Sequence, residues 1–178
     1  MSITAKKIAI LVDDYFEQAE FEKPLEELRK SGAVVTVVGA SQKDLHGMRH
    51  TEIGDAFTAD ELLANVQYDD FDALVLPGGV INADHLRMDN AARAWVREFV
   101  AHGKLIAAIC HAPWLLVSAG VVKDRKLTSY YTLQDDIRNA GATWVDETVV
   151  TDGNLITSRK PDDIPAFVQA IRQWFQNT

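Results

Sequence analysis

The stretch LIAAICHAPW, residues 105–114, joins an apolar run to the only cysteine of the chain, Cys110, and to His111. A short apolar run without alternation is typical of a strand that is buried on both faces of a parallel sheet. Pro113 is tolerated in the first turn of a helix, because its missing N–H would have no helical partner there. The stretch therefore predicts a strand over 105–109, a sharp turn at Cys110 and a helix that begins directly afterwards.

Similar apolar runs recur along the chain and alternate with amphipathic segments. The other runs are residues 8–12 (IAILV), 34–38 (VVTVV) and 73–76 (ALVL). Apolar residues at helical spacing predict helices over 20–30, 90–101 and 164–175. Because short buried strands alternating with helices indicate βαβ units, the fold class is α/β, a doubly wound sandwich with a mostly parallel sheet. Residues 46–56 are less regular and predict a short hairpin or an excursion at the sheet edge.

Composition indicates the domain organisation, the kinds of partner that the chain can bind and its location. No Pro/Ser/Gly-rich linker or internal repeat divides the 178 residues, so we expect one domain over 1–178. A net charge of -8 argues against nucleic acid or an anionic membrane as a main partner. A lone cysteine cannot form an internal disulfide, and the apolar stretch near the N-terminus is too short for a signal or a membrane span. We therefore expect a cytoplasmic protein.

Polar residues follow three of the predicted strands, where open parallel sheets bind their ligands. We expect these residues to meet at one edge of the sheet. They are Asp13, Asp14 and Glu17 after the first strand, Gly78 and Gly79 after the third, and Cys110 and His111 after the fourth.

Two interpretations of Cys110 remain open from the residues alone. Backbone N–H groups and the dipole of the following helix would favour the thiolate and lower the pKa of the thiol. Free cysteine is also among the most buried residue types, so Cys110 can be a plain core residue. The placement of Cys110 between a strand and a helix, beside a histidine, makes a nucleophile as good an interpretation as a core residue.

The groups around the thiol also have two interpretations each. His111 can act as a base if an acid orients its ring, and the acids near the expected pocket are Asp13, Asp14, Glu17 and Asp84. Gly78 and Gly79 either offer N–H groups to an oxyanion or form a plain turn. Glu17 either complements the dipole of the first helix or, when protonated, donates a hydrogen bond to sulfur.

Signals for a metal ion or a nucleotide cofactor are weak. His46 and His50 are four residues apart, but Gly47 between them makes a helix doubtful, and no HExxH or Cys/His cluster supports them. No GxGxxG or phosphate-binding loop follows a predicted strand. We expect neither a metal nor a cofactor.

Four stretches together resemble the PfpI family of intracellular cysteine peptidases, in the superfamily of the human Parkinsonism-associated deglycase. They are FEQAEFEKP (16–24), FDALVLPGG (71–79), AAICHAPWLLVSAGVV (107–122) and NAGATWVDETVVTDGNLITSRKPDD (139–163). The resemblance covers nearly the whole chain. It implies a flavodoxin-like sandwich related to class I glutamine amidotransferases, and a homodimer or larger homo-oligomer.

The resemblance also assigns roles to individual residues. Cys110 matches the nucleophile and His111 its partner, while the N–H groups of Gly79 and His111 match the oxyanion donors. Glu17 matches the acid whose protonated carboxyl lies beside the sulfur.

Further matches concern the pocket and the third member of a triad. Tyr130 matches a tyrosine close to the nucleophile, and Gly78 borders the same pocket. Ala112 stands where the family often has glycine, so its methyl group is expected to narrow the pocket or to alter the turn. The acid of the triad comes from a neighbouring subunit in the family, and Asp84, one methylene shorter than the usual glutamate, is the nearest match.

Two hypotheses about function follow. In the first, the protein is a cysteine hydrolase whose Cys110 attacks the carbonyl of a peptide, a glycated amine or methylglyoxal, in protection against stress. In the second, it is a redox-sensing or chaperone-like protein of the oxidative stress response, in which Cys110 is oxidised to the sulfinate and turnover is low.

Overall fold

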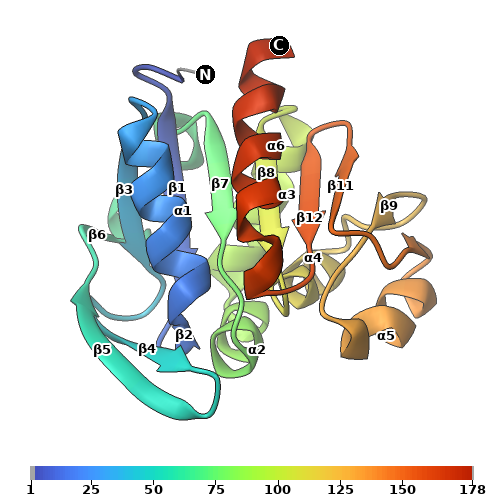
Figure 1. Cartoon of the computed structure of the whole chain (residues 1–178), viewed down its shortest axis with the longest axis horizontal. Helices are drawn as coiled ribbons and strands as arrows, with labels where there is room; N and C mark the ends of the chain where they lie inside the picture. Colours follow the sequence, from blue (N-terminus) through green and yellow to red (C-terminus); the bar gives the residue numbers. More distant parts are fainter. Residues whose placement is uncertain (1–2, 178) are drawn as a thin grey trace.

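The four strands predicted from the apolar runs form the centre of a seven-stranded sheet. In the computed structural model, which describes residues 3–177, they are β1 (Lys7–Val12), β3 (Val34–Gly39), β7 (Ala73–Leu76) and β8 (Leu105–Ile109). The strand order is β11-β12-β8-β7-β1-β3-β6, and all neighbours are parallel except β11 and β12 (Figure 1). The prediction of a mostly parallel sheet is confirmed.

Three strands of this sheet were not predicted. They are β6 (Glu61–Leu62), β11 (Val149–Asp152) and β12 (Leu155–Ser158). Thr157 and Ser158 in β12 are both fully buried although they are polar. A short run with polar residues does not show the uninterrupted apolar pattern of a central strand, which explains why β12 was missed.

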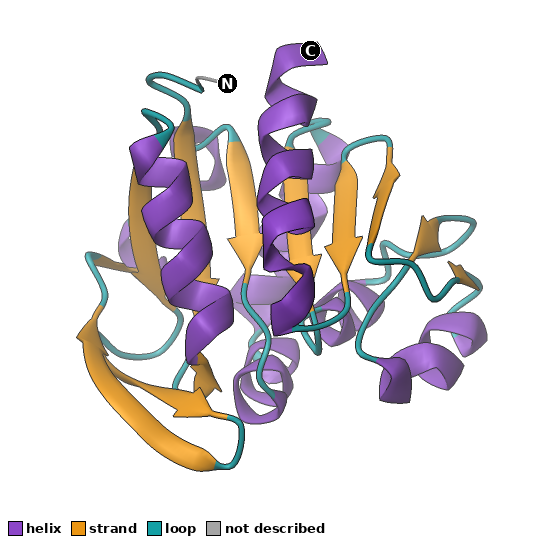
Figure 2. Cartoon of the chain, in the orientation of Figure 1, coloured by secondary structure: helices purple, strands orange, loops and turns teal. Residues whose placement is uncertain are grey.

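Helices cover both faces of the sheet (Figures 1 and 2). One face carries α1 (Gln18–Lys30) and α6 (Ile164–Asn177). The other carries α2 (Val80–Met88), α3 (Asn90–Ala101), α4 (Pro113–Ala119) and α5 (Gln134–Asn139). The predicted helices over 20–30, 90–101 and 164–175 correspond to α1, α3 and α6, and the predicted α/β/α sandwich is confirmed.

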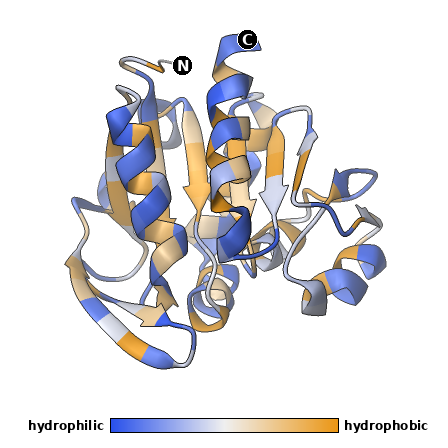
Figure 3. Cartoon of the chain, viewed as in Figure 1, coloured by the Kyte–Doolittle hydropathy of each residue, from blue (hydrophilic) through white to orange (hydrophobic). Residues whose placement is uncertain are grey.

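Alternation along the strands divides the core into two clusters. Ile8, Ile10 and Val12 of β1 pack on the face of α1 and α6. Ala9 and Leu11 pack on the opposite face, with α3 and α4. In Figure 3 the central strands are mostly hydrophobic, whereas hydrophobic and hydrophilic residues alternate along the helices.

Between residues 3 and 177, two small sheets and four short helical turns complete the fold. One sheet contains β2 (Phe16–Glu17), β4 (Asp44–Arg49) and β5 (Glu52–Thr58), and the other pairs β9 (Lys126–Leu127) with β10 (Thr143–Trp144). The 3₁₀ turns are η1 (Leu63–Asn65), η2 (Tyr68–Asp70), η3 (Tyr131–Leu133) and η4 (Pro161–Asp163). Because β4 and β5 are antiparallel, the irregular segment 46–56 lies in a hairpin, one of the two structures that we expected.

Gln18 fastens this hairpin to α1. Its side chain is 4% exposed, its Nε2 donates to Oδ2 of Asp55 at 2.7 Å, and its Oε1 accepts from the backbone N–H of Asp55 at 2.9 Å. A Cβ added to Gly47 or Gly54 would lie 2.9 Å or 2.1 Å from the Gln18 side chain. Only glycine at these two positions leaves room for the amide that holds the hairpin.

Replacing Gln18 with alanine removes both hydrogen bonds to Asp55. We predict that Gln18→Ala lowers the free energy of unfolding by about 1–2 kcal/mol and speeds amide exchange in residues 44–58 while exchange in β8 is unchanged. Gln173→Ala, on the exposed side of α6, is the control. Unchanged exchange in the hairpin would contradict the role given to Gln18.

Candidate active site

Three strand ends meet where the order of the sheet reverses. The chain passes from β1 to β3 on one side, and later adds β7 and then β8 on the other side of β1. Ligands of doubly wound sheets bind at such a reversal, outside the carboxyl ends of the strands. Gly78 follows β7 and Cys110 follows β8, and the neighbouring strands pair Leu76 with Ala108. The predicted meeting of Gly78 and Cys110 at one edge is therefore found.

Cys110 lies at the predicted sharp turn. Its φ of 64° is in the left-handed region, which residues with a side chain seldom adopt. Its N–H donates to the carbonyl of Ser158 at 3.0 Å, and its carbonyl accepts from the N–H of Tyr130 at 2.8 Å. Pro113 begins α4 three residues later. Hydrogen bonds on both sides hold the strained turn, as in a nucleophile elbow.

Gly78 and Gly79 are needed for the close approach of the chain to this turn. A Cβ on Gly78 would lie 2.6 Å from Cβ of Cys110 and 2.4 Å from Oε2 of Glu20. Gly79 has a φ of 91°, and a Cβ there would lie 2.6 Å from the backbone nitrogen of Glu17. The two glycines thus do more than form a plain turn, since a side chain at either position would collide with neighbouring atoms of the site.

The acid beside the sulfur is Glu20 and not Glu17, which corrects the prediction. Glu20 is fully buried, and its Oε2 accepts from the N–H of Gly78 at 2.9 Å. Glu17 ends β2 just before α1, and its Oε2 accepts from the N–H of His50 at 3.2 Å. Glu20 is one helical turn before Pro24, on the buried side of α1. Residues four apart lie on the same side of a helix, so the spacing between Glu20 and Pro24 was a signal in the sequence that could have identified Glu20 as the buried acid.

Burial makes the Glu20 carboxyl a neutral acid at neutral pH. Loss of hydration, followed by the charge of Glu17, raises the pKa of Glu20 to about 8. Hydrogen bonds with the Cys110 thiol and the Gly78 N–H act in the opposite direction but are weaker. Within the described chain, Oε1 of Glu20 has no hydrogen-bond partner of standard geometry.

The expected lowering of the Cys110 pKa is also wrong. The residue is 6% exposed, and burial raises the pKa of its thiol well above the ordinary value, with a further increase from Glu20. The N–H groups of Gly79 and His111 do lower it, as anticipated, but desolvation dominates. Cys110 is therefore held as a thiol that needs a base.

His111 supplies a base at the required distance. Its Nδ1 lies 3.2 Å from Sγ of Cys110, and its Nε2 lies 3.5 Å from Oγ1 of Thr132. Burial lowers the pKa of His111 to about 4, so the ring is neutral at neutral pH. A proton on Nε2 directed at Thr132 leaves the lone pair of Nδ1 free to accept from the thiol. Thr132 was not recognised in the sequence.

The other predicted pocket residues divide into two groups. Tyr130 stacks on the His111 ring, with centroids 4.7 Å apart. Ala112 is 1% exposed and packs in the core cluster of α3 and α4. Asp84 is exposed on α2, and within the described chain no hydrogen bond joins it to His111.

Asp13 and Asp14 have partners away from the His111 ring. Asp13 approaches Nδ1 of His85 at 3.7 Å, and Asp14 approaches Nδ1 of His46 at 3.2 Å. Between residues 3 and 177, no three His, Cys, Asp or Glu side chains are grouped so that they could hold a metal ion. In the same residues, no helix is long and apolar enough to cross a bilayer.

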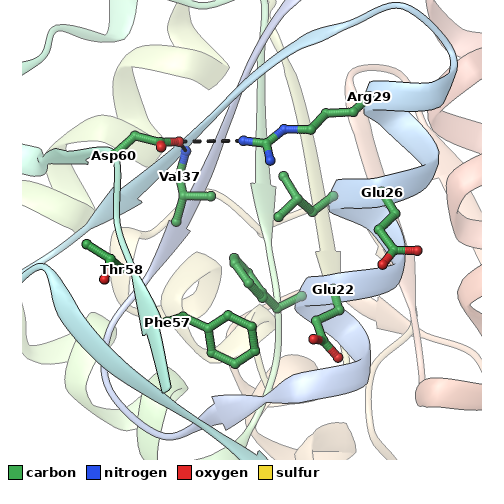
Figure 4. A pocket seen from close by; sticks show the side chains of 9 residues that line it. Glu22, Glu26, Arg29, Val37, Phe57, Thr58 and Asp60 are labelled. Carbon is green, nitrogen blue, oxygen red and sulfur yellow. Dashed lines mark hydrogen bonds and ion pairs between the residues drawn. The ribbon is translucent and has the colours of Figure 1, made fainter. Parts of the chain in front are cut away.

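A separate cavity of about 320 Å³ lies between α1 and the β4–β5 hairpin (Figure 4). Phe21, Leu25 and Phe57 form part of its apolar wall, and Arg29 approaches Asp60 at 3.7 Å at its edge. Neither Cys110 nor His111 lines this cavity. The hollow is thus distinct from the candidate active site.

The raised pKa of Glu20 makes stability depend on pH. The folded state keeps the Glu20 proton up to about pH 8, whereas the unfolded chain releases it near 4.5. The native state therefore binds more protons in this range, and the free energy of unfolding falls as pH rises, by at most about 1.4 kcal/mol per unit. We predict that Glu20→Gln removes this slope in denaturant titrations between pH 5 and 8. Glu26→Gln, exposed on the same helix, should keep it; equal slopes in both variants would refute the assignment.

Comparison with known proteins agrees with this geometry. Residues 6–173 match the DJ-1/PfpI family. The chain is 45% identical over 166 residues to protein/nucleic acid deglycase 2 of Escherichia coli, covering 92% of this chain and 94% of the relative. It is 40% identical over 164 residues to general stress protein 18 of Bacillus subtilis, covering 91% and 93%.

A solved structure gives the same result for the fold. The crystal structure of Drosophila melanogaster DJ-1beta superposes with a TM-score of 0.87 at 34% identity, over 94% of this chain and 89% of that one. The resemblance inferred from the four sequence stretches is thereby confirmed. The chain belongs to the DJ-1/PfpI family.

Proposed function

We propose that this protein is a cysteine hydrolase that removes carbonyl adducts from amines, that is, a deglycase. One observation carries the proposal: Sγ of Cys110 lies 3.2 Å from Nδ1 of His111, whose ring is neutral. The name of the E. coli relative supports the choice of glycated amines as substrates. Peptides and methylglyoxal are the other carbonyl compounds to which the same chemistry applies.

The first step joins sulfur to the substrate carbon. Nδ1 of His111 accepts the thiol proton while Sγ of Cys110 attacks the electrophilic carbon, so the C–S bond forms as the C=O electron pair moves to oxygen. The N–H groups of Gly79 and His111, which already interact with the sulfur, lie close to this oxyanion and stabilise it. Neutral Glu20 adds no negative charge to the site at this stage.

The second step releases the amine. The imidazolium of His111 gives its proton to the nitrogen on the carbon next to the attacked one. The C–N bond breaks as the hydroxyl of that carbon becomes a C=O group and passes its proton to the oxyanion. The C=O group of the attacked carbon then re-forms as the C–S bond breaks, which frees the dicarbonyl compound and the Cys110 thiol. The low pKa of His111 makes the imidazolium a strong acid, which favours this transfer. Thr132 supplies no negative charge to hold the proton on the ring.

The alternative of a redox sensor needs a thiolate that oxidants can reach. Cys110 is 6% exposed and its pKa is raised, and both features slow oxidation of the sulfur. The similarity to general stress protein 18 is compatible with either function. The geometry of Cys110 and His111 therefore favours an enzyme with turnover over a redox sensor. We propose that this enzyme serves in protection against stress.

Replacing the nucleophile tests the proposal. We predict that Cys110→Ser lowers turnover of methylglyoxal-treated amines by about 10³-fold or more, because the serine hydroxyl is a far weaker nucleophile than sulfur, while the circular dichroism spectrum is unchanged. Peptide and methylglyoxal substrates are assayed in parallel. Wild-type rates in the variant on every substrate would exclude a role for the thiol in turnover.

We further propose that the chain forms a homo-oligomer in which Asp84 of a second copy orients His111. A carboxylate beside the ring would raise the pKa of His111 above the value of about 4 in the isolated chain. We predict that Asp84→Asn moves the acid limb of the kcat profile to lower pH, by about one unit. Asp135→Asn, exposed on α5, is the control, and sedimentation measures the size of the assembly. A monomer with an unchanged acid limb would refute this arrangement.

A further inference from the structure

Asn82 is a buried polar residue to which the mechanism above gives no role. It is the third residue of α2 and is fully buried. Its Nδ2 donates to the carbonyls of Pro77 and Gly78, both at 3.0 Å, and its Oδ1 accepts from the N–H of Asp13 at 2.7 Å. The side chain thus uses both of its N–H bonds, and it ties the end of β1 to the end of β7.

The carbonyl of Gly78 belongs to the same peptide unit as the N–H of Gly79. Because this peptide is trans, the C=O and the N–H point in opposite directions. Asn82 and the N–H of Glu17, at 3.2 Å, both donate to the Gly78 oxygen from one side. On the other side, the Gly79 N–H interacts with the sulfur of Cys110. Fixing the carbonyl therefore fixes the direction of the N–H.

The Gly78–Gly79 segment would be free to turn without such an anchor. Gly79 has a φ of 91°, and glycine residues resist rotation of the peptide plane less than others do. Two hydrogen bonds to the Gly78 oxygen also polarise the peptide, which makes the Gly79 N–H a stronger donor. Asn82 thus acts on both the direction and the strength of this donor.

We propose that Asn82 is a positioning residue that aims the Gly79 N–H at the sulfur of Cys110 and at the oxyanion formed there. The oxyanion part rests on the proposed function, whereas the sulfur part does not. The two parts have separate measurements.

The first measurement needs no substrate. Iodoacetamide alkylates the thiolate of Cys110, and at pH 7 its rate is proportional to the small thiolate fraction. We expect Asn82→Ala to lower this rate by about 3-fold or more, since a misdirected N–H stabilises the thiolate less. A loosened pocket would instead expose the sulfur and raise the rate. An unchanged or faster rate in the variant overturns the proposal.

The second measurement is turnover of a methylglyoxal-treated amine. We expect Asn82→Ala to lower kcat by about 10- to 100-fold and to leave KM within about 3-fold, because the oxyanion forms during the reaction and is absent from the bound substrate. Slower alkylation together with an unchanged kcat would overturn the oxyanion part. If the wild type shows no turnover while Asn82→Ala is still alkylated more slowly than the wild type, the proposed function is refuted and the sulfur part of the proposal stands.

Two further variants distinguish a loss of the positioning role from a loss of folding. Asn154→Ala removes the same side chain just before β12, where Nδ2 donates to the carbonyl of Lys104 at 2.9 Å, and should change neither rate. Asn82→Asp keeps the size of the side chain and its acceptor but donates at most one hydrogen bond, so we expect intermediate rates. If only Asn82→Asp folds, wild-type rates in that variant overturn the proposal.

Discussion

The buried carboxyl of Glu20 is the constraint on which the rest of the site depends. It lies between the N–H of Gly78 and the thiol of Cys110, in a space from which water is excluded. A charged carboxylate there would be poorly solvated and would repel a thiolate, so the favourable state is a neutral acid beside a neutral thiol. The close packing of this carboxyl against the thiol requires a glycine after β7, because a Cβ on Gly78 would lie 2.4 Å from Oε2 of Glu20 and 2.6 Å from Cβ of Cys110.

Chemistry at this strand edge then depends on how precisely neutral dipoles are aimed. The amides of Gly79 and His111 lower the pKa of the thiol, and each is fixed by the backbone rather than by a flexible side chain. Asn82 contributes to this fixed geometry without touching the sulfur, because it anchors the carbonyl of the peptide that carries the Gly79 N–H. Fixed dipoles in a dry site stabilise developing charge without reorganising during the reaction. The arrangement is suited to a reaction that creates an oxyanion only briefly.

The sequence predicted those parts of the fold that depend on uninterrupted apolar runs. Residues 73–76 and 105–109 form strands with the bounds expected, and the elbow at Cys110 follows from the strand before it and Pro113 after it. Side-chain contacts across the sheet were harder to predict from the sequence. Glu17 and Glu20 are three residues apart, and only the burial of one side of α1 distinguishes them. The roles of Thr132 and Asn82 depend on long-range packing of α2 and η3, which no local pattern encodes, and the pKa of Cys110 depends on desolvation that only the packed structure reveals.

The protonation state of Glu20 tests the account most directly. Its carboxyl carbon can be followed by NMR in protein labelled with ¹³C-glutamate, and the spectrum of Glu20→Gln identifies the resonance. The account predicts a chemical shift typical of a neutral carboxylic acid at pH 7 and a titration midpoint near pH 8. A resonance that titrates near the ordinary value of 4.5 would show a carboxylate beside the sulfur at neutral pH and would contradict the central claim.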